Sequence, residues 1–300
     1  MKFINTQTIR VFILALLVSV ILTRCADPET DDDFTPGDPP PIGSWANSEE
    51  VSAENLVAHW GFEGNVSDSK GAVTGGAMNG NGTFTAGRKG QAYQGSSNAF
   101  ISYTSPGPLA GLTSFTVSFW INTAKHDGGA QGIFALGKAD GSFWGNFFVI
   151  VEGNTSTSDR MQLKLHFEKN TVPPVSNVEH WIDPPADKRP DNMYGAWRHV
   201  SYTYDATSSK AAFYANGQVI DIGADADRKA NSTTPLGPLA FVSATKFIIG
   251  GFQNHLGMPF NGLEPWMLNF TGKLDELRIY NKALSSQEIS AIYQLERQGR

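Results

Sequence analysis

The chain has 300 residues, with 23 lysines and arginines against 29 aspartates and glutamates, and its formal net charge at pH 7 is −6. This mild acidity and the absence of a basic stripe argue against a nucleic acid as partner. Cys25 is the single cysteine, so no disulfide within the chain can stabilise the fold, and one large hydrophobic core has to do so.

Residues 1–24 have the pattern of an export signal. Basic residues precede an apolar run from 11 to 22, which has the length of a signal-peptide core and is short for a membrane span. Cys25 follows, with Leu22 three positions before it, and this arrangement resembles the lipobox of bacterial lipoproteins. The resemblance implies that Cys25 carries a lipid anchor. Arg24 departs from the lipobox pattern, and a chance cysteine in a discarded leader is the alternative.

Residues 25–50 read as a tether. Five acidic residues lie between positions 27 and 33, and a proline-rich stretch follows. Dense like charge and proline cannot bury a core, so we expect an extended segment. Acidic residues directly after the cysteine resemble the surface-export signal of Bacteroidetes lipoproteins, which implies a lipid-anchored protein exposed at the surface of the outer membrane. A plain soluble linker is the alternative.

The remaining residues, 51–300, suffice for one large all-β domain. Segments in which apolar and polar residues alternate predict strands at 57–62, 115–121, 161–167, 197–204, 211–220, 246–251 and 274–280. In 161–167 the polar residues, His166 among them, share one face, which predicts a sheet with one solvent-exposed face. Asn216 and Gly217 predict a tight hairpin turn. Many short strands and one C-terminal helix favour two packed antiparallel sheets, as in a sandwich or jelly roll.

The segment from 272 to 289 predicts a strand, a tight turn and the start of a helix. Side chains alternate along a strand, so Asp275 should share a face with Leu277 and Ile279, where a carboxylate needs a partner. Ser285 and Glu288 then fit a capping box at the start of the helix.

Four segments resemble, in their order, the laminin-G-like and concanavalin-A-like jelly-roll domains of secreted bacterial proteins. They lie at 56–71, 115–121, 197–218 and 272–289. The likeness covers residues 56–293, so 51–300 is identified as a laminin-G-like jelly-roll domain. The resemblance implies an all-β fold of two antiparallel sheets with a short C-terminal helix.

Domains of this family often hold a calcium ion between their opening and closing strands. Glu63 and Asp275 stand at the matching positions, so the resemblance implies that both bind a structural Ca²⁺, which accepts several oxygen ligands at flexible geometry. The metal would also give Asp275 the partner that a buried carboxylate needs. A hydrogen bond from a loop amide or a pair with Arg278 is the alternative.

The same fold includes glycoside hydrolases, so the fold alone does not decide whether the protein is an enzyme. Retaining β-glucanases of this fold carry Glu-x-Asp-x-x-Glu or Glu-x-Asp-x-Glu on one strand, and the chain contains neither pattern. It also lacks Gly-x-Ser-x-Gly, His-Glu-x-x-His and a phosphate-binding loop. We therefore expect a protein that is not an enzyme. A divergent glycan-cleaving enzyme assembled from distant loops is the alternative.

Sugar-binding sites combine flat aromatic rings with planar polar side chains. Trp60 and Trp197 lie in predicted strands and should pack in the core, whereas other tryptophans lie in or beside loops. We predict a carbohydrate-binding face built from Trp144, His180, Trp181, Asn254, His255 and Trp266. Aromatic residues that only pin long loops onto the sandwich are the alternative.

These expectations combine into one function, namely a surface-anchored lipoprotein that binds a polysaccharide or glycoconjugate without catalysis. Its partners would be the glycan, the membrane through the lipid anchor, and other outer-membrane proteins of a glycan-uptake system. An envelope adhesion or structural module that binds a protein partner is the alternative from another functional class.

Overall fold

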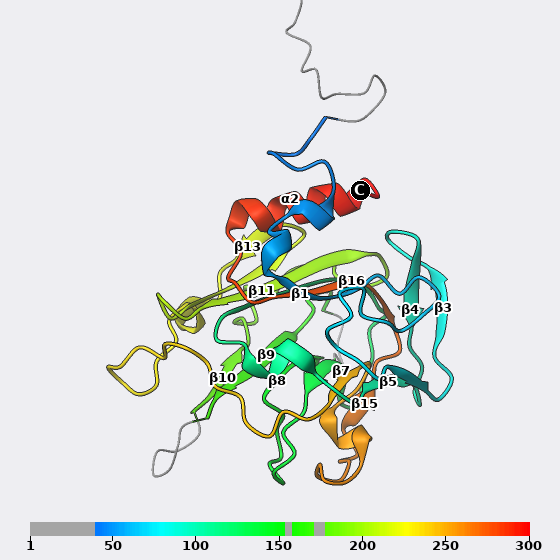
Figure 1. Ribbon diagram of the computed structural model, residues 1–300, viewed down its shortest axis with the longest axis vertical. Coiled ribbons are helices and arrows are strands. Elements are labelled where there is room, and N and C mark those ends of the chain that lie inside the picture. Colours follow the sequence, from blue (N-terminus) through cyan, green and yellow to red (C-terminus); the bar gives the residue numbers. More distant parts are fainter. Residues whose placement is uncertain (1–39, 154–157, 171–177) are drawn as a thin grey trace, which may run out of the picture. The chain divides into compact units, whose positions relative to one another are not determined.

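Two β-sheets stacked face to face make up the fold, and the expected sandwich is confirmed (Figure 1). The computed structural model describes residues 40–153, 158–170 and 178–300, and one compact unit runs from Pro41 to Arg300. Among the described residues, no helix is long and apolar enough to cross a membrane.

Sheet one holds both the opening and the closing strand of this unit. Its strands are β1 (Leu56–Trp60), β3 (Thr83–Ala86), β4 (Gln91–Gln94), β6 (Phe115–Asn122), β11 (Arg198–Asp205), β12 (Lys210–Ala215), β13 (Gln218–Ile220) and β16 (Lys273–Tyr280). They pair in the order β13-β12-β11-β6-β16-β4-β3, and β1 pairs antiparallel with the last residues of β16. The opening and closing strands are therefore direct neighbours.

Sheet two lies on the other side of the core. Its strands are β2 (Ala77–Asn79), β5 (Phe100–Tyr103), β7 (Ala130–Leu136), β8 (Phe147–Val151), β9 (Leu163–Lys169), β10 (Val178–Ile182), β14 (Phe247–Ile249) and β15 (Met267–Asn269). Their order is β10-β9-β8-β7-β14-β5-β2, and β15 runs parallel to β7.

Short helical segments complete the unit. They are η1 (Ser48–Glu50), η2 (Ala53–Asn55), η3 (Gly107–Gly111), η4 (Gly223–Ala226) and η5 (Gln253–Leu256), all 3₁₀ turns, and the α-helix α2 (Ser286–Arg297). The helix lies across the outer face of sheet one (Figure 1). Its capping box is present as predicted, because the N–H of Glu288 donates to Ser285 Oγ at 3.3 Å and Glu288 Oε2 accepts from the N–H of Ser285 at 2.7 Å.

The core follows the period-two alternation of the strands. In β6 the odd-numbered residues from 115 to 121 are buried between the sheets. Trp120 points to the outer face instead, where its ring stacks on Tyr293 of α2 with centroids 5.6 Å apart. Trp60 of β1 is fully buried in the core, as expected. Trp197 is half-buried and belongs to no core cluster of the described residues, so its expected place in the core is wrong.

The folded unit begins earlier than the sequence predicts. Ile42 and Trp45 pack against the apolar cluster that also contains the buried side of α2. The tether boundary predicted at residue 50 is therefore wrong, because apolar residues that follow the prolines reach this cluster. Residues 1–39, with the predicted signal peptide, Cys25 and the acidic stretch, lie outside the described residues.

A β-bulge in β16 decides where Asp275 points. The register places Asp275 opposite Trp120, and the following pairs are shifted because β16 holds one extra residue. Glu276, inside the bulge, has a positive φ of 47°. The extra residue leaves Asp275 on the outer face, whereas Leu277 and Ile279 point into the core. The expectation that the three side chains share a face is therefore wrong.

Apolar side chains cover part of the outer face of sheet two, which corrects the predicted solvent exposure of His166, whereas Lys164 of β9 stays half-buried and paired with Glu152. In β8 the odd-numbered residues point into the core, whereas Phe148 and Ile150 belong to a separate apolar cluster on the outer face. His166 of β9 is 0% exposed instead of solvated. The physical reason is that side chains from long loops, Trp144 and Trp266 among them, pack over this face.

Candidate functional site

An aromatic cluster lies on the outer face of sheet two and consists of Phe143, Trp144, Trp181 and Trp266. Trp144 is central, because its ring centroid lies 4.7 Å from that of Phe143, 5.3 Å from that of Trp181 and 5.9 Å from that of Trp266. The residues come from the β7–β8 loop, from β10 and from the segment before β15. The structure thus brings together three tryptophans that are far apart in the sequence.

The aromatic cluster is packed on its inner side and open on its outer side. Trp144 stacks on Phe148 of β8 with centroids 5.5 Å apart, and all three tryptophans are half-buried. Phe143 is 38% exposed. The rings therefore do pin loops onto the sheet, and they also leave apolar surface in contact with solvent. Phe143 escaped the sequence analysis because it lies outside any alternating segment.

His166 lies beneath the aromatic cluster. Its ring centroid is 4.5 Å from that of Phe148 and 4.7 Å from that of Trp181. Within the described part of the chain neither ring nitrogen has a hydrogen-bond partner, and the nearest carboxylate oxygen, Glu179 Oε2, is 3.8 Å from Nε2. Buried polar groups are normally hydrogen-bonded, so His166 is an unusual polar group at this position.

Two predicted ligand-binding residues, His180 and Asn254, lie away from the aromatic cluster. His180 precedes Trp181 in β10, so it points to the opposite face and stacks on Phe167 with centroids 5.4 Å apart. Burial, reinforced by the Arg228 charge, lowers the pKa of His180 to about 4. Asn254 is buried, and its Nδ2 donates to the carbonyl of Gly262 at 3.1 Å. The structure does not bring either residue to the aromatic cluster.

His255 lines a pocket of about 480 Å³ that adjoins the aromatic cluster, and we call it the polar pocket. Its other lining residues are Ser97, Asn98, Gln131, Leu263, Met267, Leu268, Asn269 and Thr271. Met267 directly follows Trp266, and both side chains belong to the apolar cluster on the outer face of sheet two, which connects the pocket to the aromatic cluster. Burial lowers the pKa of His255, and its Nδ1 accepts the N–H of Phe252 at 3.1 Å. Apolar walls and planar amides therefore meet here.

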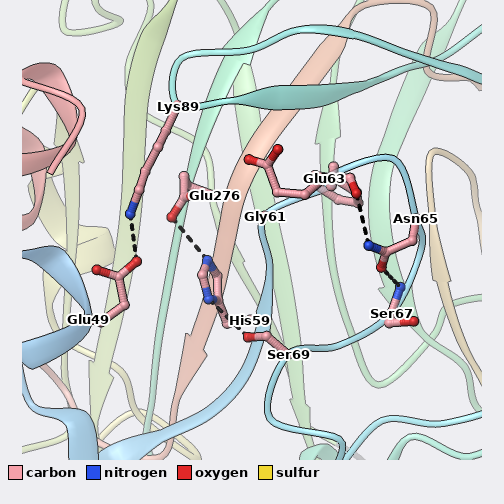
Figure 2. A pocket seen from close by; sticks show the side chains of 10 residues that line it. Glu49, His59, Gly61, Glu63, Asn65, Ser67, Ser69, Lys89 and Glu276 are labelled. Carbon is pink, nitrogen blue, oxygen red and sulfur yellow. Dashed lines mark hydrogen bonds and ion pairs between the residues drawn. The ribbon is translucent and has the colours of Figure 1, made fainter.

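A second pocket of about 480 Å³, which we call the β1 pocket, lies beside β1 and β16 (Figure 2). Lys89 Nζ and Glu49 Oε1 form an ion pair of 2.6 Å at its wall. His59 stands in its middle, with Nε2 3.0 Å from Glu276 Oε2 and Nδ1 3.1 Å from Ser69 Oγ. Sequence reasoning missed this arrangement because the three residues form no short motif.

Glu63 and Asp275, the predicted calcium ligands, both contact the turn between β3 and β4. Glu63 Oε2 accepts the N–H of Gln91 at 3.0 Å. Asp275 Oδ2 accepts the N–H groups of Arg88 and Lys89 at 2.6 and 2.9 Å. Burial raises the pKa of Asp275 to about 8, although these donors oppose the rise.

This donor set does not fit a calcium ion shared by Glu63 and Asp275, because both carboxylates face N–H groups rather than other oxygen ligands. Over the described ranges, no group of three or more histidines, cysteines, aspartates or glutamates could hold a metal. Backbone N–H groups of the β3–β4 turn and of Glu276 are the partners of Asp275 that the structure shows, and calcium stays a prediction.

Solved structures with the same fold include several binding domains. Domain 4 of an extracellular arabinanase from Geobacillus stearothermophilus, in complex with arabinotriose, is 20% identical, with a TM-score of 0.51 over 80% of this chain and 98% of that chain. The binding domain of botulinum neurotoxin DC in complex with rat synaptotagmin II is 16% identical, with a TM-score of 0.54 over 81% of this chain and 52% of that chain.

A botulinum neurotoxin type C structure, from a toxin that depends on two ganglioside molecules to enter cells, is 14% identical. Its TM-score is 0.53 over 81% of this chain and 51% of that chain, so the protein spans about half of each neurotoxin chain. At these identities the likeness shows the fold alone. No curated protein matches the chain.

The family itself is shown by sequence. Residues 94–290 match the family described as the concanavalin A-like lectin/glucanases superfamily. This range is about two thirds of the chain and includes the strands from β5 to β16 and the start of α2. The protein therefore belongs to the concanavalin A-like lectin/glucanases superfamily.

Proposed function

We propose that the protein binds carbohydrate through the aromatic cluster and the polar pocket, and that it does not cleave glycosidic bonds. The observation that carries the proposal is the placement of Phe143, Trp144 and Trp266 as a half-open ring surface beside a pocket that contains amides and an imidazole. Aromatic rings pack on the apolar C–H faces of a sugar, and planar polar side chains bind its hydroxyls.

The composition of the polar pocket favours binding over hydrolysis. Glycoside hydrolysis normally needs two carboxyl groups on either side of the scissile bond. The described residues that line the polar pocket include neither an aspartate nor a glutamate. A glycan held there would meet amides, hydroxyls and apolar groups, which can orient it but lack the acid and the nucleophile.

The structural neighbours support a glycan as the ligand class. The arabinanase domain was solved with arabinotriose, and the type C neurotoxin depends on gangliosides. We infer a polysaccharide or glycoconjugate here, without a choice among sugars. A protein partner is the alternative ligand class. It is supported by the neurotoxin binding domain solved with synaptotagmin II and by the exposed apolar side chain of Leu263, which could contact a protein.

The binding test uses a glycan array followed by titration of the glycans that are retained. Trp266→Ala and Phe143→Ala should each weaken binding at least about tenfold, because truncation of an aromatic anchor typically costs more than ~1.4 kcal/mol. Val219→Ala is the matched control, since Val219 is an exposed apolar residue of β13 in sheet one. Unchanged affinity in both aromatic variants, with unchanged unfolding temperatures, would reject the aromatic cluster as the site.

The proposal includes a lipid anchor at Cys25 and a position at the outer surface of the outer membrane, beside other proteins of a glycan-uptake system. Its support is the apolar run, the cysteine and the acidic residues that follow it. Cys25→Ala should abolish incorporation of labelled palmitate and release the protein from the membrane fraction. Labelling that persists in this variant would contradict the anchor.

A further inference from the structure

A hydrogen-bonded row of Ser69, His59 and Glu276 lies in the β1 pocket (Figure 2). Ser69 Oγ is 3.1 Å from His59 Nδ1, and His59 Nε2 is 3.0 Å from Glu276 Oε2. His59 belongs to β1, Glu276 to β16, and Ser69 to the loop after β1, so the pairing of the opening and closing strands creates the row. It is separate from the carbohydrate-binding surface proposed above.

The hydrogen bonds of the row run in the direction that activates a serine hydroxyl. Glu276 Oε2 accepts from both His59 and Arg278, so Nε2 of His59 carries the ring proton and Nδ1 is left as the acceptor for the Ser69 hydroxyl. Solvent exposure decreases along the row: Ser69 is exposed, whereas His59 and Glu276 are 9% and 3% exposed. The serine is therefore the member of the row that a substrate could reach. Burial also lowers the pKa of His59, which favours the neutral ring that can accept a proton.

The backbone around the row is held firmly. The N–H of Ser69 donates to the carbonyl of His59 at 2.8 Å, and the N–H of His59 donates to Asp68 Oδ1 at 2.8 Å. Phe62 and Glu276, which both line the pocket, have positive φ values of 52° and 47°. Such strained conformations in residues other than glycine concentrate at functional sites.

We propose that Ser69 is a nucleophile that hydrolyses small acyl esters, with His59 as general base and Glu276 as the residue that positions it. Ser69 Oγ attacks the ester carbonyl carbon, its proton passes to His59 Nδ1, and His59 returns the proton to the alcohol that leaves. Water then attacks the acyl-serine through the same histidine, and the carboxylic acid is released with Ser69 restored.

The test treats the full chain with diisopropyl fluorophosphate, which forms a bond between the serine oxygen and phosphorus with loss of fluoride. We expect one adduct, mapped to Ser69 by mass spectrometry, and none in Ser69→Ala. Ser67→Ala is the matched control, because Ser67 lines the same pocket without a contact to His59, and it should keep the adduct. His59→Gln should slow labelling by about 100-fold or more, as removal of a general base does.

Ester turnover is a second measurement that does not depend on the folding of His59→Gln. Turnover of 4-nitrophenyl acetate should be lost in Ser69→Ala and retained in Ser67→Ala, and both variants replace an exposed residue. An absent adduct, an adduct elsewhere, or equal turnover in wild type and Ser69→Ala would overturn the proposal. Glycan affinity should be the same in all these serine variants, so failure here and failure of the carbohydrate proposal are distinguishable.

Discussion

Arg278 Nε donates to Glu296 Oε1 at 2.8 Å, and both side chains are 0% exposed. This pair joins β16 to α2 across the outer face of sheet one. Trp120 Nε1 donates to the other oxygen of Glu296 at 2.7 Å, and Arg278 Nη2 donates to Ser48 Oγ at 3.0 Å. One buried guanidinium therefore connects the closing strand with the C-terminal helix and with η1 at the start of the folded unit.

Glu296→Ala should strongly destabilise the protein. It removes one acceptor of a fully buried guanidinium, and breaking a buried ion pair from one side typically costs 3–5 kcal/mol. We expect a loss of about 3 kcal/mol in the free energy of unfolding, at the lower end because Glu276 still pairs with Arg278. Urea denaturation measures this change.

Lys210→Ala provides the comparison for Glu296→Ala. Lys210 pairs with Asp227, but their side chains are 60% and 58% exposed. Exposed ion pairs contribute about 0–1 kcal/mol, so this variant should unfold close to wild type. Equal losses in the two variants would contradict the role of burial.

The capping box predicts a pH dependence that Glu288→Gln should reveal. Burial alone raises the pKa of Glu288, but hydrogen bonds from Ser52 and Ser285 and the Lys282 ammonium outweigh burial and lower it to about 2. A carboxyl with a lowered folded pKa contributes stability above its unfolded pKa of about 4.5 and loses it as the pH falls toward 2.

Glu288→Gln should therefore be less stable than wild type at pH 7 by ~1 kcal/mol. The difference in unfolding free energy should shrink as the pH falls from 4.5 toward 2. Guanidinium unfolding at several pH values measures it. A difference that stays constant over this range would show that the charge of Glu288 is not what stabilises the helix start.

Asp275→Ala should destabilise the β3–β4 turn. It leaves the half-buried N–H groups of Arg88 and Lys89 without their acceptor, and we expect a total loss of roughly 1–3 kcal/mol because water can satisfy them only in part. Asp275→Asn keeps one acceptor oxygen and should lose less. Chemical denaturation gives the stability loss, and amide hydrogen exchange of Arg88 and Lys89 shows whether it is local. Unaltered exchange in Asp275→Ala would argue against this contact.

Calcium at Glu63 and Asp275 has a direct test in thermal unfolding. The backbone N–H contacts of both carboxylates favour an unfolding temperature that EDTA leaves unchanged. The metal implied by the family resemblance would instead be supported if EDTA lowered the unfolding temperature and CaCl₂, but not MgCl₂, raised it again. Glu63→Gln should then remove that calcium response.

Features that depend only on neighbours along the chain followed from local sequence patterns. The alternation of residues 115–121 predicted strand β6, and Ser285 with Glu288 predicted the helix start. Asn216 and Gly217 have φ values of 50° and 74°, as a tight turn between β12 and β13 requires. Local patterns suffice here because the periodicity and the caps act within a few residues.

Long-range strand pairing and loop packing set where the polar and aromatic groups of the candidate sites meet. The bulge at Glu276 depends on how β16 pairs with β6, so no period-two rule could place Asp275 correctly. The sequence pattern predicted a solvated His166 because the rings that cover it come from β10 and from the β7–β8 loop, far away in the sequence. Ser69, His59 and Glu276 likewise meet because β1 pairs with β16, and long-range pairing leaves no pattern in either segment alone.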